Sequence, residues 1–358
     1  MKINKKSLNG FINYGIVIVV YAVLQLLIGA GQLSNSLQSL LVPACCYVVM
    51  TVSLNLTVGI LGELSLGHAG FMSLGAFGGI IASIALQDAI PFAPLRLTVA
   101  ILVGAALGAI GGVIIGVPVL RLQGDYLAIV TLAFGQIIKN IIMILYVGVD
   151  ENGFHVAAKA ENFHLTETGT AIIKGPMGAV GVTKLASFTA GAILILITLL
   201  VVQNLVNSRA GRAIMALRDN RIAAESVGIP AGKYKLMAFV TSAALAGAAG
   251  ALFGLNYSST VASKFNFNTS ILVLVFVVLG GLGNIRGSMI AAALLYVLPE
   301  LLRGFNIAEY RMLVYAVILI LVMLFTNNPT LQSFFVGLKE KIFKKRPETT
   351  VKGGGANE

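Results

Sequence analysis

Long apolar stretches alternate with short polar ones along the chain. No Asp, Glu, Lys or Arg occurs from residue 7 to residue 62, and six further stretches of more than 20 residues are equally free of charge: 64–87, 97–120, 186–208, 237–263, 265–285 and 313–338. About 20 apolar helical residues cross a hydrocarbon core of roughly 30 Å, and a helix in lipid satisfies its own backbone amides. The pattern predicts an all-α fold, a polytopic transmembrane bundle in which residues 1–358 form one domain.

Breaks in the apolar pattern predict about ten spans, namely 11–30, 40–60, 61–86, 97–116, 126–147, 187–206, 236–255, 271–281, 289–302 and 311–325. Six glycines lie within residues 62–79. This density favours a span that is broken or re-entrant before Ala69 over one continuous helix. Residues 280–288, with the sequence GGLGNIRGS, either turn the chain between two spans or break one helix in two.

Basic side chains dominate the polar segments. The chain is 57% hydrophobic and carries a net charge of +11. Only 11% of its residues are charged, against about 25% in soluble domains. Fifteen of the 25 Lys and Arg residues fall in three segments: 2–6, 209–235 and 339–352. Because this charge follows the ends of predicted spans, it indicates membrane topology and not a nucleic-acid partner.

The same charges predict which loops lie on which side of the membrane. Lys and Arg next to membrane spans mark the cytoplasmic side. We therefore expect both termini (residues 1–10 and 330–358) and the loop 208–235 in the cytoplasm, and the loop 148–185 outside the cell.

The motifs of an ATPase or another enzyme are missing from the sequence. The one Gly-Lys pair, Gly232-Lys233, lacks the glycine spacing of a phosphate-binding loop, and no catalytic constellation is evident. His155 and His164 have no cysteine or clustered carboxylate near them, so no metal site is expected. We predict a chain that is not an enzyme and binds no cofactor, so that active transport through it requires energy from another chain.

Four glycines recur at four-residue spacing within one predicted span: Gly104, Gly108, Gly112 and Gly116. Such a ridge of small residues lets another helix approach closely in a membrane, where helices have no hydrophobic drive to associate. We expect these glycines to serve helix packing.

Lys139 is a cation within the predicted span 126–147, and Gln136 lies one turn before it. A charged residue inside a membrane usually faces a cavity or a partner, which makes Lys139 a candidate for the translocation path. A structural ion pair, or a lysine that reaches the membrane interface, explains it equally well.

The loop 208–235 is longer and more helical in pattern than a turn between spans requires. It holds six Lys and Arg residues against two acidic ones, and Gly211 and the sequence Gly228-Ile229-Pro230 bracket a helix-compatible run. The residues alone leave two interpretations open. A short basic helix fits a groove on a partner protein, or the loop is solvated and only fixes topology.

Four stretches match a known family pattern in the family's order: LNLTVGILGELSLGHAGFMSLGAF (54–77), LRLQGDYLAIVTLAFGQIIKNI (120–141), ALRDNRIAAESVGIPAGKYKLMAFVTSAALAGAAGALFG (216–254) and VLGGLGNIRGSMIAAALL (278–295). With these stretches the chain resembles the permeases of branched-chain amino acid ABC importers of the LivM type. The resemblance implies a type II ABC importer fold in the bacterial inner membrane. It also implies transport of branched-chain amino acids.

The resemblance implies partners and site residues as well. Such permeases work with a second permease, two ATP-binding subunits that use ATP and Mg²⁺, and an external solute-binding protein. Docking on the ATP-binding subunits is implied for the residues that match the family's coupling loop: Arg218, Ile222, Ala223, Ala224, Glu225 and Gly228. In particular, Arg218 is expected to pair with acidic groups of the ATPase. A place near the translocation path or its inner gate is implied for the residues that match the Gly-His-Ala segment: Gly67, His68, Ala69 and Gly70.

Departures from the family pattern leave the substrate open. Ile222 and Gln136 stand where glutamate is expected, and a Gly-Gly-Pro element is only partly present at residues 174–179. Related permeases carry urea or short amides. An ion-coupled secondary transporter is another alternative, and it needs embedded acidic residues; here these lie near span boundaries: Glu63, Asp125 and Glu300. A scaffold that moves nothing is a third alternative.

Overall fold

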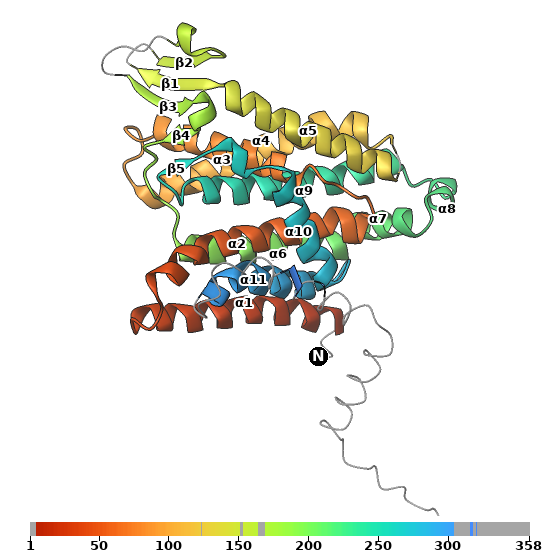
Figure 1. The fold of residues 1–358 in the computed structure, drawn as a ribbon. Helices are drawn as coiled ribbons and strands as arrows, with labels where there is room; N and C mark the ends of the chain where they lie inside the picture. The colour runs from red at the N-terminus through yellow and green to blue at the C-terminus, as the bar shows by residue number, and fades with distance from the viewer. Residues whose placement is uncertain are drawn as a thin grey trace, which may run out of the picture.

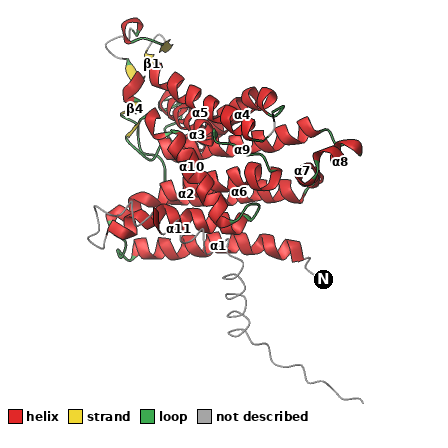
Figure 2. Ribbon diagram, turned by 45° about the vertical axis from the view of Figure 1, so that its right-hand side comes forward, coloured by secondary structure: helices red, strands yellow, loops and turns green. Residues whose placement is uncertain are grey.

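The structure, a computed structural model, describes residues 5–122, 124–150, 153–163, 169–303, 316–317 and 320. Long helices lie side by side between two ends of the molecule (Figures 1 and 2). In chain order they are α1 (Lys5–Gly29), α2 (Asn35–Asn55), α3 (His68–Ala85), α4 (Ala93–Val119), α5 (Asp125–Ile144), α6 (Phe188–Asn207), α9 (Ala231–Gly254), α10 (Phe267–Gly280) and α11 (Ile285–Arg303). Two short helices lie between α6 and α9: α7 (Arg209–Asp219) and α8 (Arg221–Ser226).

Eight helical segments among the described residues are long and apolar enough to cross a membrane. The prediction of a polytopic helical bundle is therefore confirmed. A further helix, α11, covers the predicted span 289–302. The predicted span 311–325 lies almost entirely outside the described residues.

The two ends of the bundle differ. The start of α1 lies at the same end as α7 and α8, and a small sheet caps the opposite end (Figure 1). The loop 208–235 and the loop 148–185, which were predicted to face opposite sides of a membrane, therefore lie at opposite ends of the molecule.

That sheet departs from the predicted all-α fold. Its five strands pair antiparallel in the order β2-β1-β3-β4-β5. They are β1 (Tyr146–Asp150), β2 (Gly153–Ala157), β3 (Thr170–Lys174), β4 (Ala179–Val180) and β5 (Ser259–Thr260), with short 3-10 turns at Ala160–Asn162, Gly175–Met177 and Ala262–Lys264. The strands are too short for an alternating pattern to stand out, and β5 comes from the loop after α9, so no local signal predicts this sheet.

The chain breaks between α2 and α3, where the glycines predicted it. α2 continues as a short π-helix, η1 (Leu56–Leu61), which ends at Gly62 in the left-handed conformation with φ 80°. Residues 62–67, here called the helix break, are not helical, and α3 begins at His68. The prediction that the span starts anew before Ala69 is confirmed. In the segment 280–288 the chain likewise forms two helices, α10 and α11, with a turn between them.

The glycine ridge of α4 lies against α9. A Cβ added at Gly108 would lie 2.4 Å from the carbonyl oxygen of Ala243, which is closer than atoms can approach. All four glycines of the ridge face α9 in this way: Gly104, Gly108, Gly112 and Gly116. α3 meets α9 in the same manner, since a Cβ at Gly75 would lie 1.9 Å from the carbonyl oxygen of Gly247. Close backbone contact thus joins α3, α4 and α9 into one tightly packed group.

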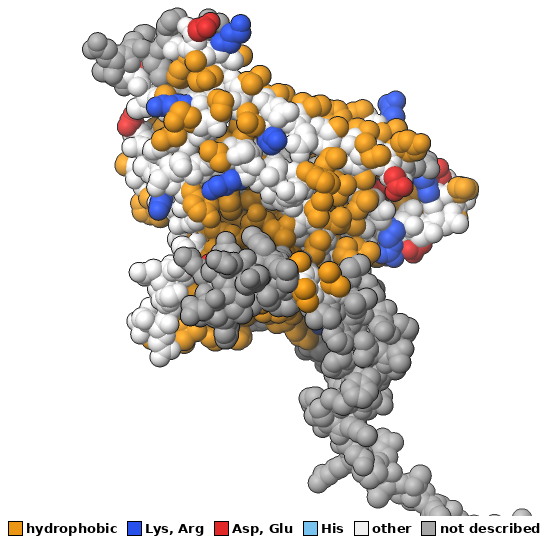
Figure 3. All heavy atoms as spheres, in the orientation of Figure 1, with side chains coloured by type: hydrophobic (Ala, Val, Ile, Leu, Met, Phe, Trp, Pro, Cys, Tyr) orange, Lys and Arg blue, Asp and Glu red, His pale blue; other side chains and the backbone are white. Residues whose placement is uncertain are grey.

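Apolar side chains also cover the outer faces of several helices. Leu26 of α1, Ile114 of α4 and Ile129 of α5 are 74%, 65% and 60% exposed. Figure 3 shows a largely apolar surface between the two ends, with charged side chains mostly near α7 and α8 and near the sheet. Exposed apolar surface of this extent suits contact with lipid or with other transmembrane helices.

Gly108→Leu tests the packing of α4 on α9. The added side chain collides with the α9 backbone, so we expect the free energy of unfolding to fall by about 1–3 kcal/mol. The melting temperature in detergent measures this. Ile110→Leu is the control, because Ile110 is 54% exposed on the outer face of α4 and its replacement should change little. Equal melting temperatures for the two variants would contradict the packing.

Candidate functional site at the α7–α8 loop

The α7–α8 loop, residues 208–235, is held firmly against the bundle. The hydroxyl of Ser208 caps α7 by accepting a hydrogen bond from the amide of Gly211 at 3.1 Å. On the inner face of α7, Ile214 is fully buried and packs with η1 and with Ala238 of α9. The loop is therefore a folded element whose position follows that of η1.

α8 keeps its helical shape although it has only six residues. The side chain of Asn220 caps it by accepting the amide of Ala223 at 3.0 Å. Arg221 and Glu225 form an ion pair across one turn at 2.9 Å, which adds about 0.3–0.5 kcal/mol to a helix of this kind.

Ala224 lies on the inner side of α8. It is 4% exposed and forms a small core with Leu217 and Ala231. The family resemblance implied that Ala224 seats directly on an ATP-binding subunit, but in this structure it offers no surface to a partner. Its small size instead lets α8 pack against α7 and the start of α9.

Two apolar side chains stand out at the end of the loop. Ile222 is 81% exposed and Val227 is 76% exposed, the highest values of any large apolar side chain in the described ranges. The resemblance pointed to Ile222, whereas Val227 was missed; its signal is an apolar residue directly before a Gly-Ile-Pro turn. With their exposed neighbours they form a surface that we call the docking tip: Ile222, Ala223, Glu225, Val227 and Gly228.

Arg218 is engaged within the chain. Its Nη1 donates to the carbonyl oxygen of Gly59 in η1 at 3.1 Å, and its Nε and Nη2 donate to the Asp219 carboxylate at 3.1 and 2.9 Å. A cation that donates to the last carbonyl groups of a helix stabilises that end of the helix. Arg218 therefore caps η1, and its expected pairing with acidic groups of a partner ATPase competes with these two contacts.

A buried ion pair ties α9 to the helix break. Lys235 of α9 donates to the carboxylate of Glu63, and the two side chains are only 7% and 13% exposed. Removing one partner of such a pair costs about 3–5 kcal/mol, because the other charge is left buried without compensation. No local pattern predicts this pairing, because the two residues are 172 positions apart.

Other helices supply hydrogen bonds to the backbone of the helix break and of the start of α3. The amide of Leu66 donates to the hydroxyl of Thr131 in α5 at 3.1 Å, and the amide of Ala69 donates to the hydroxyl of Ser270 in α10 at 3.1 Å. Buried backbone amides that lack a partner are costly. The irregular path of the chain at this point thus depends on α5 and α10.

The Gly-His-Ala segment, Gly67 to Gly70, lies at the start of α3. A Cβ at Gly67 would lie 2.2 Å from the carbonyl oxygen of Thr131, and one at Gly70 would meet the next turn of α5. His68 is buried and shares a hydrogen bond of 2.8 Å with the hydroxyl of Ser53 in α2. These contacts make the start of α3 a close junction between α2, α3 and α5.

Asn55 joins the end of α2 to the turn between α10 and α11. Its Oδ1 accepts the amide of Gly283 at 2.8 Å, and its Nδ2 donates to the hydroxyl of Ser288 at 2.9 Å. Gly59 of η1 approaches the same turn, since a Cβ there would lie 2.2 Å from the nitrogen of Gly283. The α10–α11 turn, α7 and α9 therefore all meet at η1 and the helix break.

Lys139 takes part in none of the hydrogen bonds described above for η1 and the helix break. It is half-buried on α5, five residues before the helix ends at Ile144, and it forms no ion pair with any described residue. This position, near the sheet end of α5, suits a lysine whose long side chain reaches the membrane interface. It does not support a packed structural ion pair.

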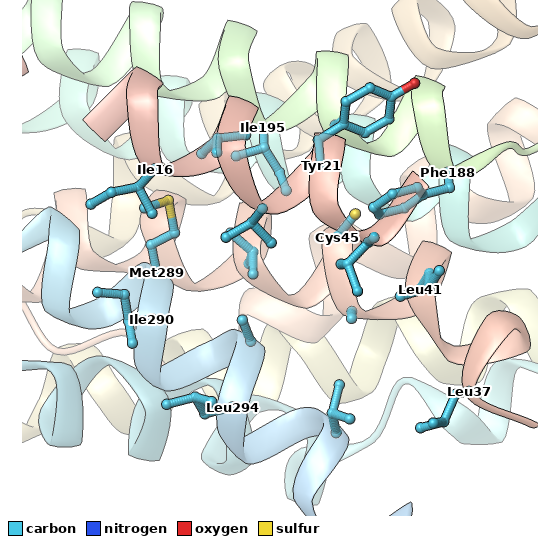
Figure 4. A pocket seen from close by; sticks show the side chains of 18 of the residues that line it. Ile16, Tyr21, Leu37, Leu41, Cys45, Phe188, Ile195, Met289, Ile290 and Leu294 are labelled. Carbon is cyan, nitrogen blue, oxygen red and sulfur yellow. The ribbon is translucent and has the colours of Figure 1, made fainter. Parts of the chain in front are cut away.

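An apolar pocket opens between α1, α2, α6 and α11 (Figure 4). Ile16, Leu41 and Met289 are among the side chains around it, and the hydroxyl of Tyr21 is bonded to that of Thr189 at 3.1 Å. A zwitterionic amino acid needs polar partners for its charged groups when it leaves water. The apolar lining of this pocket does not provide them.

Comparison with known proteins identifies the family. The family model described as "Branched-chain amino acid transport system / permease component" matches residues 36–323. The high-affinity branched-chain amino acid transport system permease protein LivM of Escherichia coli (strain K12) is 33% identical over 324 residues, which cover 87% of this chain and 71% of that protein. LivM of Salmonella typhimurium is 34% identical over 292 residues, which cover 78% of this chain and 66% of that protein.

A second type of permease protein is similar over a shorter stretch. LivH of Salmonella typhimurium is 34% identical over 117 residues, which cover 33% of this chain and 38% of LivH. No solved structure matches the chain. On the family model and the LivM relatives, the chain belongs to the family of branched-chain amino acid transport system permease components.

Proposed function

We propose that this permease subunit belongs to an ATP-driven importer and that an ATP-binding subunit seats on its docking tip. The observation that carries this proposal is the exposure of Ile222 and Val227 at the end of a basic, folded loop. Exposed apolar side chains become the main anchors of an interface when a partner buries them. The partner subunits bind and hydrolyse ATP with Mg²⁺, and this chain binds no cofactor.

The docking role is divided within the loop. Ile222, Ala223, Glu225 and Gly228, with Val227, face the partner, whereas Ala224 is buried beneath them. Arg218 holds α7 on η1. The loop thus presents a rigid surface, which favours binding because little conformational entropy is lost.

In the membrane, the chain has about ten spans with both termini in the cytoplasm. The α7–α8 loop faces the cytoplasm, and the sheet at the opposite end faces outward. Two observations support this orientation: the basic residues of the loop 209–235, and the position of the start of α1 at the same end as α7 and α8 (Figure 1). The location is the plasma membrane of a bacterium.

The assembly contains two ATP-binding subunits, a second permease and an external solute-binding protein. The similarity to both LivM and LivH supports a pair of related permeases. The exposed apolar faces of α4 and α5 offer surface for such a neighbour, and the solute-binding protein delivers substrate at the sheet end. The start of α3, with Gly67, His68 and Gly70, lies beside the translocation path or its inner gate.

Branched-chain amino acids are the substrates that the family and the names of the LivM relatives support. A permease for urea or short amides is the alternative within the same class. An ion-coupled transporter is less well supported, because Glu63 is already paired with Lys235 and Asp125 stands at the first residue of α5. Lys139 is retained as a candidate for the translocation path, because it forms no ion pair with any described residue.

The variant Ile222→Asp/Val227→Asp tests the docking tip. Placing carboxylates at the two apolar anchors should reduce co-purification of the cognate ATP-binding subunits in detergent at least tenfold, since central anchor residues each contribute about 2 kcal/mol or more. The matched control is Val156→Asp/Met177→Asp, which places the same charges at exposed apolar positions of the sheet end. If both double variants retain the ATP-binding subunits as the wild type does, the docking tip is wrongly assigned.

Uptake into proteoliposomes tests the substrate. With the complete assembly, external binding protein and internal ATP, we expect accumulation of radiolabelled leucine that unlabelled isoleucine and valine suppress. Urea and acetamide at the same concentration should have no effect. Accumulation driven by a sodium or proton gradient without ATP would favour the ion-coupled alternative.

A further inference from the structure

Two side chains of the α7–α8 loop contact the chain on either side of a backbone hinge at Gly62. Before the hinge, Arg218 of α7 donates to the carbonyl oxygen of Gly59. After it, Lys235 of α9 pairs with Glu63. Between them lies Gly62, whose φ of 80° ends η1 and turns the chain toward α3. The loop therefore contacts the chain both before and after Gly62, where the backbone changes direction.

The Arg218 side chain also fills the space beside the hinge. A Cβ added at Gly62 would lie 2.6 Å from Cγ of Arg218 and 3.4 Å from its Cδ. On the other side of the hinge, the Glu63–Lys235 pair is nearly inaccessible to water. Pulling these charges apart would leave both of them buried without a partner, which is strongly unfavourable. A displacement of the loop is consequently accompanied by a displacement of residues 59–63.

A displacement of residues 59–63 is transmitted directly to the transmembrane helices. Glu63 precedes His68, the first residue of α3, by five positions. The start of α3 is bonded to α10 through the Ala69 amide and the Ser270 hydroxyl. On the η1 side, Gly59 lies against the α10–α11 turn. A shift of residues 59–63 is thus transmitted to α3 and α10 through these direct contacts, and no long helix lies between them.

We propose that Glu63 and Lys235, together with Arg218, are positioning residues that transmit movement of the docking tip to the start of α3. The proposal rests on the proposed function in one respect, since the movement originates in the ATP-binding subunits. It adds that the docking tip and the helix break move as one unit, and that an ion pair remote from the docking surface is required for transport.

A charge-exchange experiment on the assembled transporter in proteoliposomes tests this. The variants are Glu63→Lys, Lys235→Glu and the double exchange Glu63→Lys/Lys235→Glu. The matched control is Lys233→Glu, which reverses a charge in the same turn of α9 at an exposed position. For each variant three quantities are measured: co-purification of the ATP-binding subunits, substrate uptake, and stimulation of ATP hydrolysis by substrate-loaded binding protein.

We expect each single exchange to retain the ATP-binding subunits but to lower uptake and stimulated hydrolysis at least fivefold, the lower range of coupling between sites. The double exchange should recover most of both activities, and the control should resemble the wild type. If a single exchange fails to fold, as judged by melting in detergent, Glu63→Gln and Lys235→Met replace the pair and should show the same loss of stimulation.

Two outcomes would overturn the proposal: single exchanges that transport as the wild type does, or folded single exchanges that lose the ATP-binding subunits together with uptake. In the second case the ion pair only maintains the shape of the docking tip. Failure of the wild-type chain to retain any ATP-binding subunit would instead overturn the proposed function, so the two failures are distinguishable.

Discussion

A backbone that leaves helical geometry inside an apolar bundle has to find hydrogen-bond partners elsewhere, and the helix break meets this demand through other helices. Thr131 of α5 and Ser270 of α10 accept the amides of Leu66 and Ala69. Arg218 of α7 donates to the last turn of η1. The rest of the structure depends on these hydrogen bonds, because every helix that supplies a partner has to keep its position relative to the helix break.

Close packing between helix backbones keeps these helices in position. Helices in lipid have no hydrophobic drive to associate and depend on contact and hydrogen bonding. Gly108 and Gly75 bring α4 and α3 against the same stretch of α9, around Ala243 and Gly247, at distances that a side chain would prevent. α9 begins in the α7–α8 loop and carries Lys235, so the helix against which α3 and α4 both pack also carries the cation bound to Glu63.

Local pattern in the sequence was sufficient to predict the long helices, the helix break and the glycine ridge of α4. Charge-free stretches located the long helices of the described residues, the glycines from Gly62 onward predicted the interruption before Ala69, and four-residue spacing singled out Gly108 and its neighbours. The sheet was missed because its strands are short and β5 is distant in sequence. The Glu63–Lys235 pair was missed for a related reason: contacts between residues far apart in sequence leave no periodic signal. The burial of Ala224 and the exposure of Val227 depend on how α8 folds back on α7, which a motif match does not reveal.

We expect the docking tip and the helix break to respond together when partner subunits bind ATP. Hydrogen–deuterium exchange on the assembled transporter, compared with and without a non-hydrolysable ATP analogue, measures this joint response. The nucleotide should change exchange in the loop 208–235 and in residues 56–69 in parallel, while the centres of α4 and α9 stay protected. A nucleotide-dependent change in the loop with unchanged exchange in residues 56–69 would contradict it.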